Sequence, residues 1–178
     1  PPARSELELQ RELTSRGASN RPAAQRASFL GCGAYDHFIP TVVDTLAGQG
    51  QFVTAYTPYQ AEASQGSLQA FFEFQTQIAR LTSLDAANAS LYEGATASSE
   101  AVMLAVNTTG KRRVLVASTL HPDYRAVVRT YLADLPAQYV ELPATEGRID
   151  ATTLKQHVDN DTACVIIQSP NVFGLLEN

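Results

Sequence analysis

The stretch RRVLVASTLHPDYRAVVRTYLADL, residues 112–135, decides the fold class because it joins two different hydrophobic periods. Residues 112–118 form a short, nearly continuous apolar run, which is typical of a strand buried on both faces. Residues 121–135 carry apolar side chains at helical spacing, with Pro122 at a position that a first helical turn tolerates. A buried strand that leads directly into a helix is the building unit of a parallel α/β sheet.

The same alternation continues on both sides of this stretch. We expect further strands at residues 87–93, 138–143 and 162–170, and further helices at residues 95–109 and 150–158. Alternating strands and helices of this length favour a mostly parallel sheet with helices on both faces. The predicted fold class is therefore α/β, a three-layer α/β/α arrangement.

The first part of the chain has a different texture. A short helix is expected from Ser5, whose spacing to Glu8 is that of a capping box, and a polar linker follows. We therefore predict a helical arm and linker at residues 1–28, and part of the α/β domain at residues 29–178. The strongest helical pattern lies at residues 67–84 and predicts a buried stripe. The stripe comprises Leu68, Phe71, Phe72, Gln75, Ile78 and Leu81.

Composition limits the classes of function. The 178 residues carry a formal net charge of -5, with 44% hydrophobic and 17% charged residues. This balance favours a soluble globular protein and argues against nucleic acid or an anionic membrane as a partner. No apolar run approaches the roughly 18 residues that a membrane-spanning helix needs. Cys32 and Cys164 form neither a metal-site nor a disulfide pattern, which favours a reducing, cytoplasmic location.

The ends of the chain suggest a larger protein. The sequence begins without methionine and stops just after an apolar, turn-rich stretch at residues 169–177. We expect a piece of a longer chain, with an incomplete sheet that exposes apolar surface.

Ligands of open parallel sheets bind outside the carboxyl ends of the strands. Three such ends are predicted, at residues 92–96, 118–123 and 168–172. At the first, Gly94, Ala95 and Thr96 open a helix, where backbone amides and the helix dipole favour an anion such as phosphate. The alternative is an ordinary tight turn between a strand and a helix.

The second predicted strand end carries His121, with Tyr124 close by. A histidine at this position is suited to stack on, or hydrogen-bond to, a flat heteroaromatic ligand. The alternative is a structural role, as a helix cap or as a partner of Asp123. The chain contains no P-loop, no G-x-G-x-x-G, no G-x-S-x-G and no cluster of metal ligands, which excludes most common α/β enzymes.

Four blocks of sequence, in order along the chain, carry a resemblance to a known family. They are FLGCGAYDHFIPTVVD at 29–44, TAYTPYQAEASQGSLQAFFEFQTQIARLT at 54–82, NASLYEGATASSEAVMLA at 88–105 and SPNVFG at 169–174. Together they closely resemble the glycine decarboxylase P-protein of the glycine cleavage system, and more narrowly subunit 1 of its two-subunit bacterial form. The resemblance covers the chain from about Phe29 to its end.

This resemblance implies the large domain of a type I pyridoxal-phosphate-dependent transferase fold. It also implies glycine decarboxylation on pyridoxal phosphate, with transfer of the aminomethyl group to the lipoyl arm of H-protein. The implied partners are P-protein subunit 2, lipoyl H-protein and glycine. The cofactor supplies the chemistry and the protein orients it.

The sequence departs from a complete pyridoxal-phosphate site. Its only lysines, Lys111 and Lys155, lie in a turn and on a polar helix, where neither is expected to form the Schiff base. In the two-subunit family the lysine belongs to subunit 2. We therefore expect no catalytic residue in this chain, no covalent cofactor, and a vestigial cofactor corner. That corner would consist of Gly94, Ala95, Thr96 and His121.

The resemblance also suggests a role for a segment outside the corner. Tyr56, Thr57 and Tyr59 would reach the partner's active site, or they would only pack the subunit interface. The competing function is a non-catalytic domain that scaffolds the catalytic subunit. A free-standing aminotransferase-like enzyme is disfavoured by the missing lysine.

Overall fold

The structure is a computed structural model that describes residues 2–22, 25–27, 29, 37–53, 60, 62 and 65–177. The chain divides into two compact units, residues 1–35 and residues 36–178, which are described separately. The predicted boundary after residue 28 stays a prediction.

The first unit contains one helix, α1 (Glu6–Gly17), among its described residues. The predicted capping box is confirmed: the Ser5 hydroxyl accepts the Glu8 amide at 3.4 Å, and the Glu8 carboxylate accepts the Ser5 amide at 2.8 Å. These two bonds satisfy amide donors that a helix start leaves open, which is why the helix begins here.

The second unit begins with three helices, α2 (Thr41–Ala47), α3 (Gly50–Val53) and α4 (Gln65–Thr82). Helix α4 confirms the strongest helical prediction, but the expected burial of its stripe is wrong. None of its residues is buried, and Phe72 and Leu81 are 68% and 82% exposed. An apolar period specifies a helix with an apolar face, but it does not specify what covers that face.

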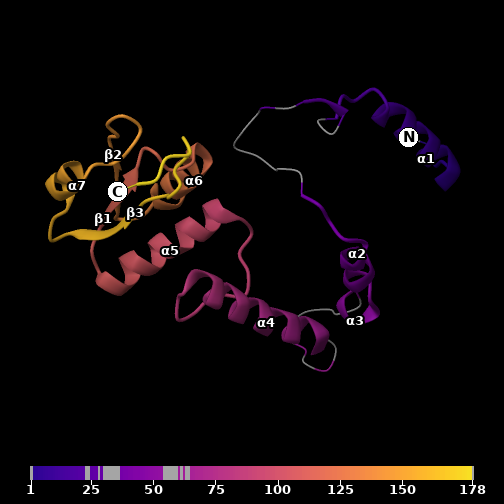
Figure 1. The fold of residues 1–178 in the computed structure, drawn as a ribbon, viewed down its shortest axis with the longest axis horizontal. Helices are drawn as coiled ribbons and strands as arrows, with labels where there is room; N and C mark the ends of the chain where they lie inside the picture. Colours follow the sequence, from indigo (N-terminus) through magenta and orange to yellow (C-terminus); the bar gives the residue numbers. More distant parts are fainter. Residues whose placement is uncertain are drawn as a thin grey trace. The chain divides into compact units, whose positions relative to one another are not determined.

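The rest of the second unit alternates between helix and strand (Figure 1). Its elements are α5 (Gly94–Thr109), β1 (Arg113–Ala117), α6 (Pro122–Leu132), β2 (Gln138–Leu142), α7 (Ala151–His157) and β3 (Thr162–Ile166). The strands form a parallel sheet in the order β2-β1-β3. The predicted α/β class and parallel pairing are confirmed.

One predicted strand is wrong. Residues 87–93 contain no strand and pair with no neighbour in the sheet. The segment is short and carries polar residues among its apolar ones, and alternation alone does not create a partner to pair with. The start of α5 therefore does not follow a strand end.

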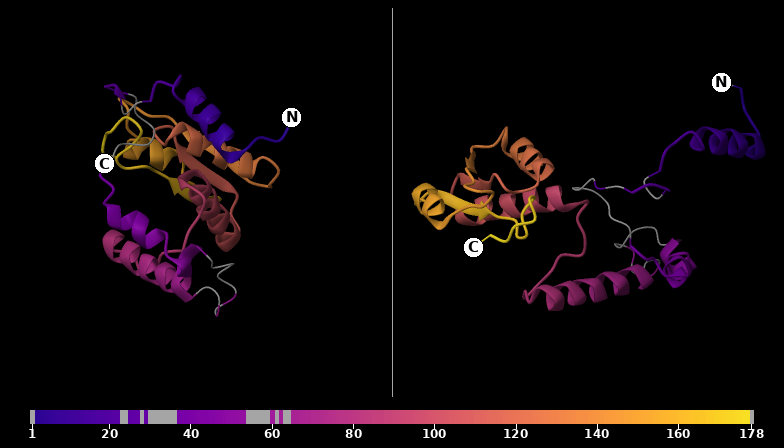
Figure 2. Two further views of the ribbon diagram at one scale, coloured as in Figure 1. Left: turned by 90° about the vertical axis from the view of Figure 1, so that its right-hand side faces the viewer. Right: turned by 45° about the horizontal axis from the view of Figure 1, so that its top comes forward.

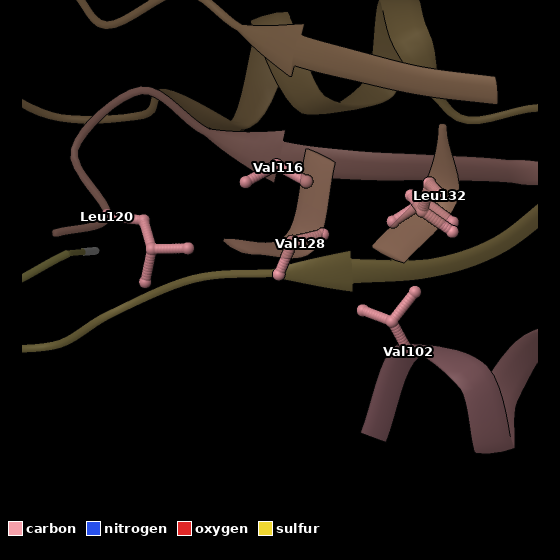
Figure 3. Packing of buried hydrophobic residues seen from close by; sticks show 6 residues of the cluster. Val102, Val116, Leu120, Val128 and Leu132 are labelled. Carbon is pink, nitrogen blue, oxygen red and sulfur yellow. The ribbon is translucent and has the colours of Figure 1, made fainter. Parts of the chain in front are cut away.

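Two buried clusters make the sheet the middle of three layers. On one face, Val114 and Val116 of β1 pack with Val102 of α5 and with Val128 and Leu132 of α6 (Figure 3). On the other face, Leu115 and Ala117 pack with Leu142 and Ile149, and Leu154 of α7 lies against them. Successive side chains of β1 thus point to opposite faces. Figure 2 shows the strands and these helices from two further directions.

Candidate functional site

The start of α5 is closed by the side chain of the residue before it. Glu93 is the N-cap, and its carboxylate accepts the backbone amides of Ala95 at 2.5 Å and Thr96 at 2.8 Å. Hydrogen bonds from the amides of Thr96 and Ala95 hold the pKa of Glu93 below its ordinary value. The amides that were predicted to favour phosphate therefore already bind an anion, and that anion belongs to the chain itself.

The hydroxyl groups of the same corner are also engaged within the chain. The Thr96 hydroxyl donates to the Glu93 carbonyl at 3.0 Å and accepts the Glu93 amide at 3.3 Å, which completes a reciprocal cap. The Ser98 hydroxyl donates to the Gly94 carbonyl at 2.8 Å. The donated bonds would have to be exchanged before either hydroxyl could donate to an outside ligand.

Tyr124 of α6 covers the first residue of α5. A Cβ atom on Gly94 would lie 2.0 Å from the Tyr124 hydroxyl oxygen and 2.5 Å from the ring carbon that bears it. A side chain at position 94 would require the Tyr124 ring to shift. Gly94 thus allows α5 and α6 to approach, and the space above it is filled by a phenol.

His121 takes the structural role that the sequence left open. It is the N-cap of α6, and its Nδ1 accepts the Asp123 amide at 3.2 Å. Its ring lies 5.3 Å from the ring of Tyr124, centroid to centroid. Tyr124 therefore contacts both Gly94 and His121, and the structure brings the two predicted parts of the corner together through it.

The loops after β1 and β3 meet as expected for parallel strands. The backbone amide of His121 donates to the Gln168 side chain at 3.0 Å, and the Val172 amide donates to the Thr119 carbonyl at 3.0 Å. These bonds fix the loop that carries His121 against the end of the sheet. Sequence reasoning placed both loops at one edge but did not anticipate the contacts.

Beyond this edge lies a polar network that the sequence did not reveal. Asn171 is buried, donates to the Gly147 carbonyl and to Glu177, and accepts the amides of Phe173 and Leu175. The Glu177 carboxylate also accepts the Thr119 hydroxyl and the Ile149 amide. The contacts join residues far apart in sequence, so no local pattern signals them.

Both lysines lie away from the corner. Lys111 precedes β1, at the amino edge of the parallel sheet, whereas His121 and Gln168 follow the carboxyl ends. Lys155 is exposed in the last turn of α7, and that turn also reaches the amino edge, because the His157 carbonyl accepts the guanidinium of Arg113 at 3.0 Å. Neither lysine is placed to form a Schiff base with a ligand in the corner.

The remaining candidates are a tyrosine segment, the two cysteines and possible metal ligands. Tyr56, Thr57, Tyr59 and Cys32 lie outside the described residues. Burial raises the pKa of the Cys164 thiol, which disfavours a reactive thiolate. No group of three or more His, Cys, Asp or Glu side chains suited to a metal ion occurs within the described ranges.

Comparisons with known proteins identify the family of this chain. The family model described as "Glycine cleavage system P-protein" matches residues 1–178. The chain belongs to this family. The match includes the N-terminal arm, which extends the predicted resemblance beyond Phe29 to the start of the sequence.

Two relatives and one solved structure illustrate the similarity. Proteins of Bacillus pumilus (strain SAFR-032) and Bacillus subtilis (strain 168), both named "Probable glycine dehydrogenase (decarboxylating) subunit 1", are each 51% identical to the chain, over 99% and 98% of its length. A crystal structure of glycine decarboxylase (P-protein) of the glycine cleavage system, in inhibitor-bound form, matches all of the chain with a TM-score of 0.91 and 46% identity. The chain spans 39% of the length of each of these proteins.

The P-protein family implies pyridoxal phosphate, and the residues of this chain do not fit that cofactor. Its phosphate would meet the carboxylate of Glu93 at the amides of Ala95 and Thr96. Its ring would compete with Tyr124 for the space between Gly94 and His121. In the described part of the chain, no lysine lies at this corner to anchor it. The expectation that the corner is vestigial agrees with this geometry but stays a prediction.

Among the described residues, no helix is both long enough and apolar enough to span a membrane.

Proposed function

We propose that the chain is part of subunit 1 of a glycine dehydrogenase (decarboxylating) that works in the glycine cleavage system. The complete enzyme would decarboxylate glycine and transfer the aminomethyl group to lipoyl H-protein. The observation that carries this proposal is 51% identity, over almost the whole chain, to relatives named as subunit 1 of that enzyme.

The proposal includes the finer fold, the large domain of a type I pyridoxal-phosphate-dependent transferase. Three parallel strands with helices on both faces support it, as does the TM-score of 0.91 to a glycine decarboxylase. Further strands would come from the part of the longer protein that this chain does not include. The bacterial relatives and the cysteine usage support a cytoplasmic location.

The division of labour between subunits follows from the corner. The family resemblance implies that the Schiff-base lysine comes from subunit 2, and the position of Lys111 and Lys155 away from the carboxyl edge of the sheet agrees with this. Pyridoxal phosphate held there would supply the electron sink for decarboxylation. Tyr56, Thr57 and Tyr59 of this chain would then reach the active site of that partner.

The occupied corner also favours a second candidate, a non-catalytic domain that scaffolds the catalytic subunit. Both candidates require assembly with subunit 2. They differ in whether this chain contributes side chains to the reaction. The segment with Tyr56 and Tyr59 decides between them.

The test reconstitutes full-length subunit 1 with subunit 2 and lipoyl H-protein and measures exchange of labelled bicarbonate into the carboxyl group of glycine. We expect exchange only when both subunits are present. Exchange at an unchanged rate without subunit 1 would contradict the proposal.

A paired set of variants separates the two candidates. The double substitution of Tyr56 and Tyr59 by Phe should leave assembly intact and lower the exchange rate, whereas Tyr131→Phe on α6 serves as a control that removes a hydroxyl elsewhere. Unchanged exchange in the double variant, with assembly intact, would support the scaffold instead.

A further inference from the structure

At the start of α5, the backbone amides bind an anion that belongs to the chain itself, the carboxylate of Glu93. Two amide donors, from Ala95 and Thr96, point at the two carboxylate oxygens of Glu93, one donor to each oxygen. Convergent amides at a helix start, in the positive field of the helix dipole, are what proteins use to bind phosphate oxygens. A carboxylate with two acceptor oxygens satisfies the same donors.

The arrangement around this carboxylate is locked by further contacts. The Thr96 hydroxyl hydrogen-bonds to the backbone amide and carbonyl of Glu93, and the Ser98 hydroxyl donates to the Gly94 carbonyl. Tyr124 lies directly on Gly94 and so closes the other side of the helix start. An incoming phosphate would have to displace a carboxylate, and a phosphate bound beside it would place two anions on one set of donors.

We propose that the carboxylate of Glu93 takes the place of a phosphate group in this chain, so that the corner is closed to pyridoxal phosphate and to other phosphate ligands. Glu93 is thus an intramolecular substitute for a phosphate group, because its carboxylate accepts the two amides that such a group would otherwise bind. The inference rests on the proposed function only for the identity of the excluded cofactor.

The proposal predicts that removing the carboxylate opens an anion site. In Glu93→Ala the two amides lose their acceptor while Gly94, Ala95 and Thr96 remain. In Glu93→Gln the side chain keeps one acceptor oxygen and loses its charge. Glu100→Ala is the matched control, since Glu100 is an exposed glutamate of the same helix, away from its start.

Full-length subunit 1 and these three variants are compared by thermal unfolding and by isothermal titration with inorganic phosphate, against chloride at equal ionic strength. Inorganic phosphate is the probe because pyridoxal phosphate also reacts with surface lysines. In chloride we expect a lower Tm for Glu93→Ala than for the wild type. Phosphate should then raise the Tm of that variant, saturably, by more than it raises those of the wild type and Glu100→Ala. Glu93→Gln should show a smaller extra rise.

The comparison with the wild type decides the result. If phosphate shifts the Tm of both Glu93 variants by no more than it shifts the wild type, the amides at the start of α5 do not bind phosphate once the carboxylate is removed. The proposal then fails. A wild-type subunit whose own phosphate binding is lost in Glu93→Ala would overturn it as well. The measurement involves no turnover, so its failure leaves the bicarbonate exchange result standing, and the reverse also holds.

Discussion

The hydroxyl oxygen of Tyr124 lies 2.0 Å from the place that a Cβ atom on Gly94 would occupy. Real Cβ atoms essentially never approach another heavy atom so closely, so the two residues constrain each other. Gly94 is needed because the ring of Tyr124 passes over it, and not because the backbone adopts a left-handed conformation. The small-residue start of α5 thus has a packing reason that is independent of any phosphate.

Gly94→Ala should therefore destabilise the protein. Overpacking of a tight contact costs about 1–3 kcal/mol, which chemical denaturation of full-length subunit 1 would measure. The added methyl group meets only Tyr124 among the three nearest atoms, so Tyr124→Ala in the same protein should remove most of the additional cost of Gly94→Ala. Gly50→Ala is the control, because a Cβ atom there meets nothing within 4 Å. Equal costs of Gly94→Ala with and without Tyr124 would contradict the contact.

Leu115 at the centre of β1 should be among the most sensitive core positions. It has no exposed surface and packs with Ala117, Leu142 and Ile149. Leu115→Ala is expected to lower the free energy of unfolding by about 2–5 kcal/mol, since a cavity adds to the lost burial. Leu104→Ala removes the same atoms from an α5 side chain that is 69% exposed and should cost far less in this unit. Similar costs at the two positions would mean that the sheet is not the stabilising centre.

How much of this fold the sequence predicts depends on the range of the interactions. Elements from α5 to β3 were predicted because strand and helix periods are local, and the capping box of Ser5 and Glu8 is local as well. The supposed strand at 87–93 failed because pairing requires a neighbour that the local pattern does not contain. The stripe of α4 failed for a similar reason, since its period cannot say what covers it.

The corner shows the same limit at the level of side chains. Gly94 and His121 were predicted from their positions in the sequence. The side chains that fill the corner, Glu93 and Tyr124, were not predicted to do so. Glutamate is not among the residues favoured at N-caps, so nothing in the local sequence marked Glu93 as the anion of its own helix. Tyr124 was noticed beside His121, yet its contact with Gly94 arises from the packing of α6 on α5, which only the structure shows.

Asn171 tests the polar network at the carboxyl edge of the sheet. Its amide group donates to Gly147 at 2.8 Å and to Glu177 at 2.9 Å, so Asn171→Asp would place a carboxylate against two acceptor oxygens. We expect a loss of about 1–3 kcal/mol at neutral pH, measured by denaturation. The loss should shrink on acidification, because a proton shared by the two carboxyl groups restores one donor. Asn88→Asp adds the same charge at an exposed position and should cost little.

Asp150 should make stability depend on acid pH. Its carboxylate caps α7 by accepting the backbone amide of Thr153 at 2.7 Å, and this bond holds its pKa below the ordinary value. A carboxyl group with a lowered folded-state pKa contributes stability above its unfolded pKa, about 3.9, and loses it as the pH falls through the folded value. Asp150→Asn should thus lower Tm at neutral pH, and the difference from wild type should fade as the pH falls through the lowered folded-state pKa of Asp150. Asp134→Asn, outside any helix, is the control. A difference that grows on acidification would contradict this sign.

The two lysines provide the sharpest test of which subunit holds the cofactor. Lys111 lies at the amino edge of the sheet and Lys155 is exposed on α7, so neither reaches the corner that contains Gly94 and His121. Replacing both by arginine keeps their charge and removes both lysine amines of residues 1–178. In the assembled enzyme, we expect the double variant to keep its visible absorbance, its borohydride-fixed label on subunit 2 and its rate of bicarbonate exchange. Each single substitution serves as a control for the other. If the double variant loses the absorbance or the label while the subunits still assemble, the cofactor is anchored in this chain and the division of labour between the subunits is reversed.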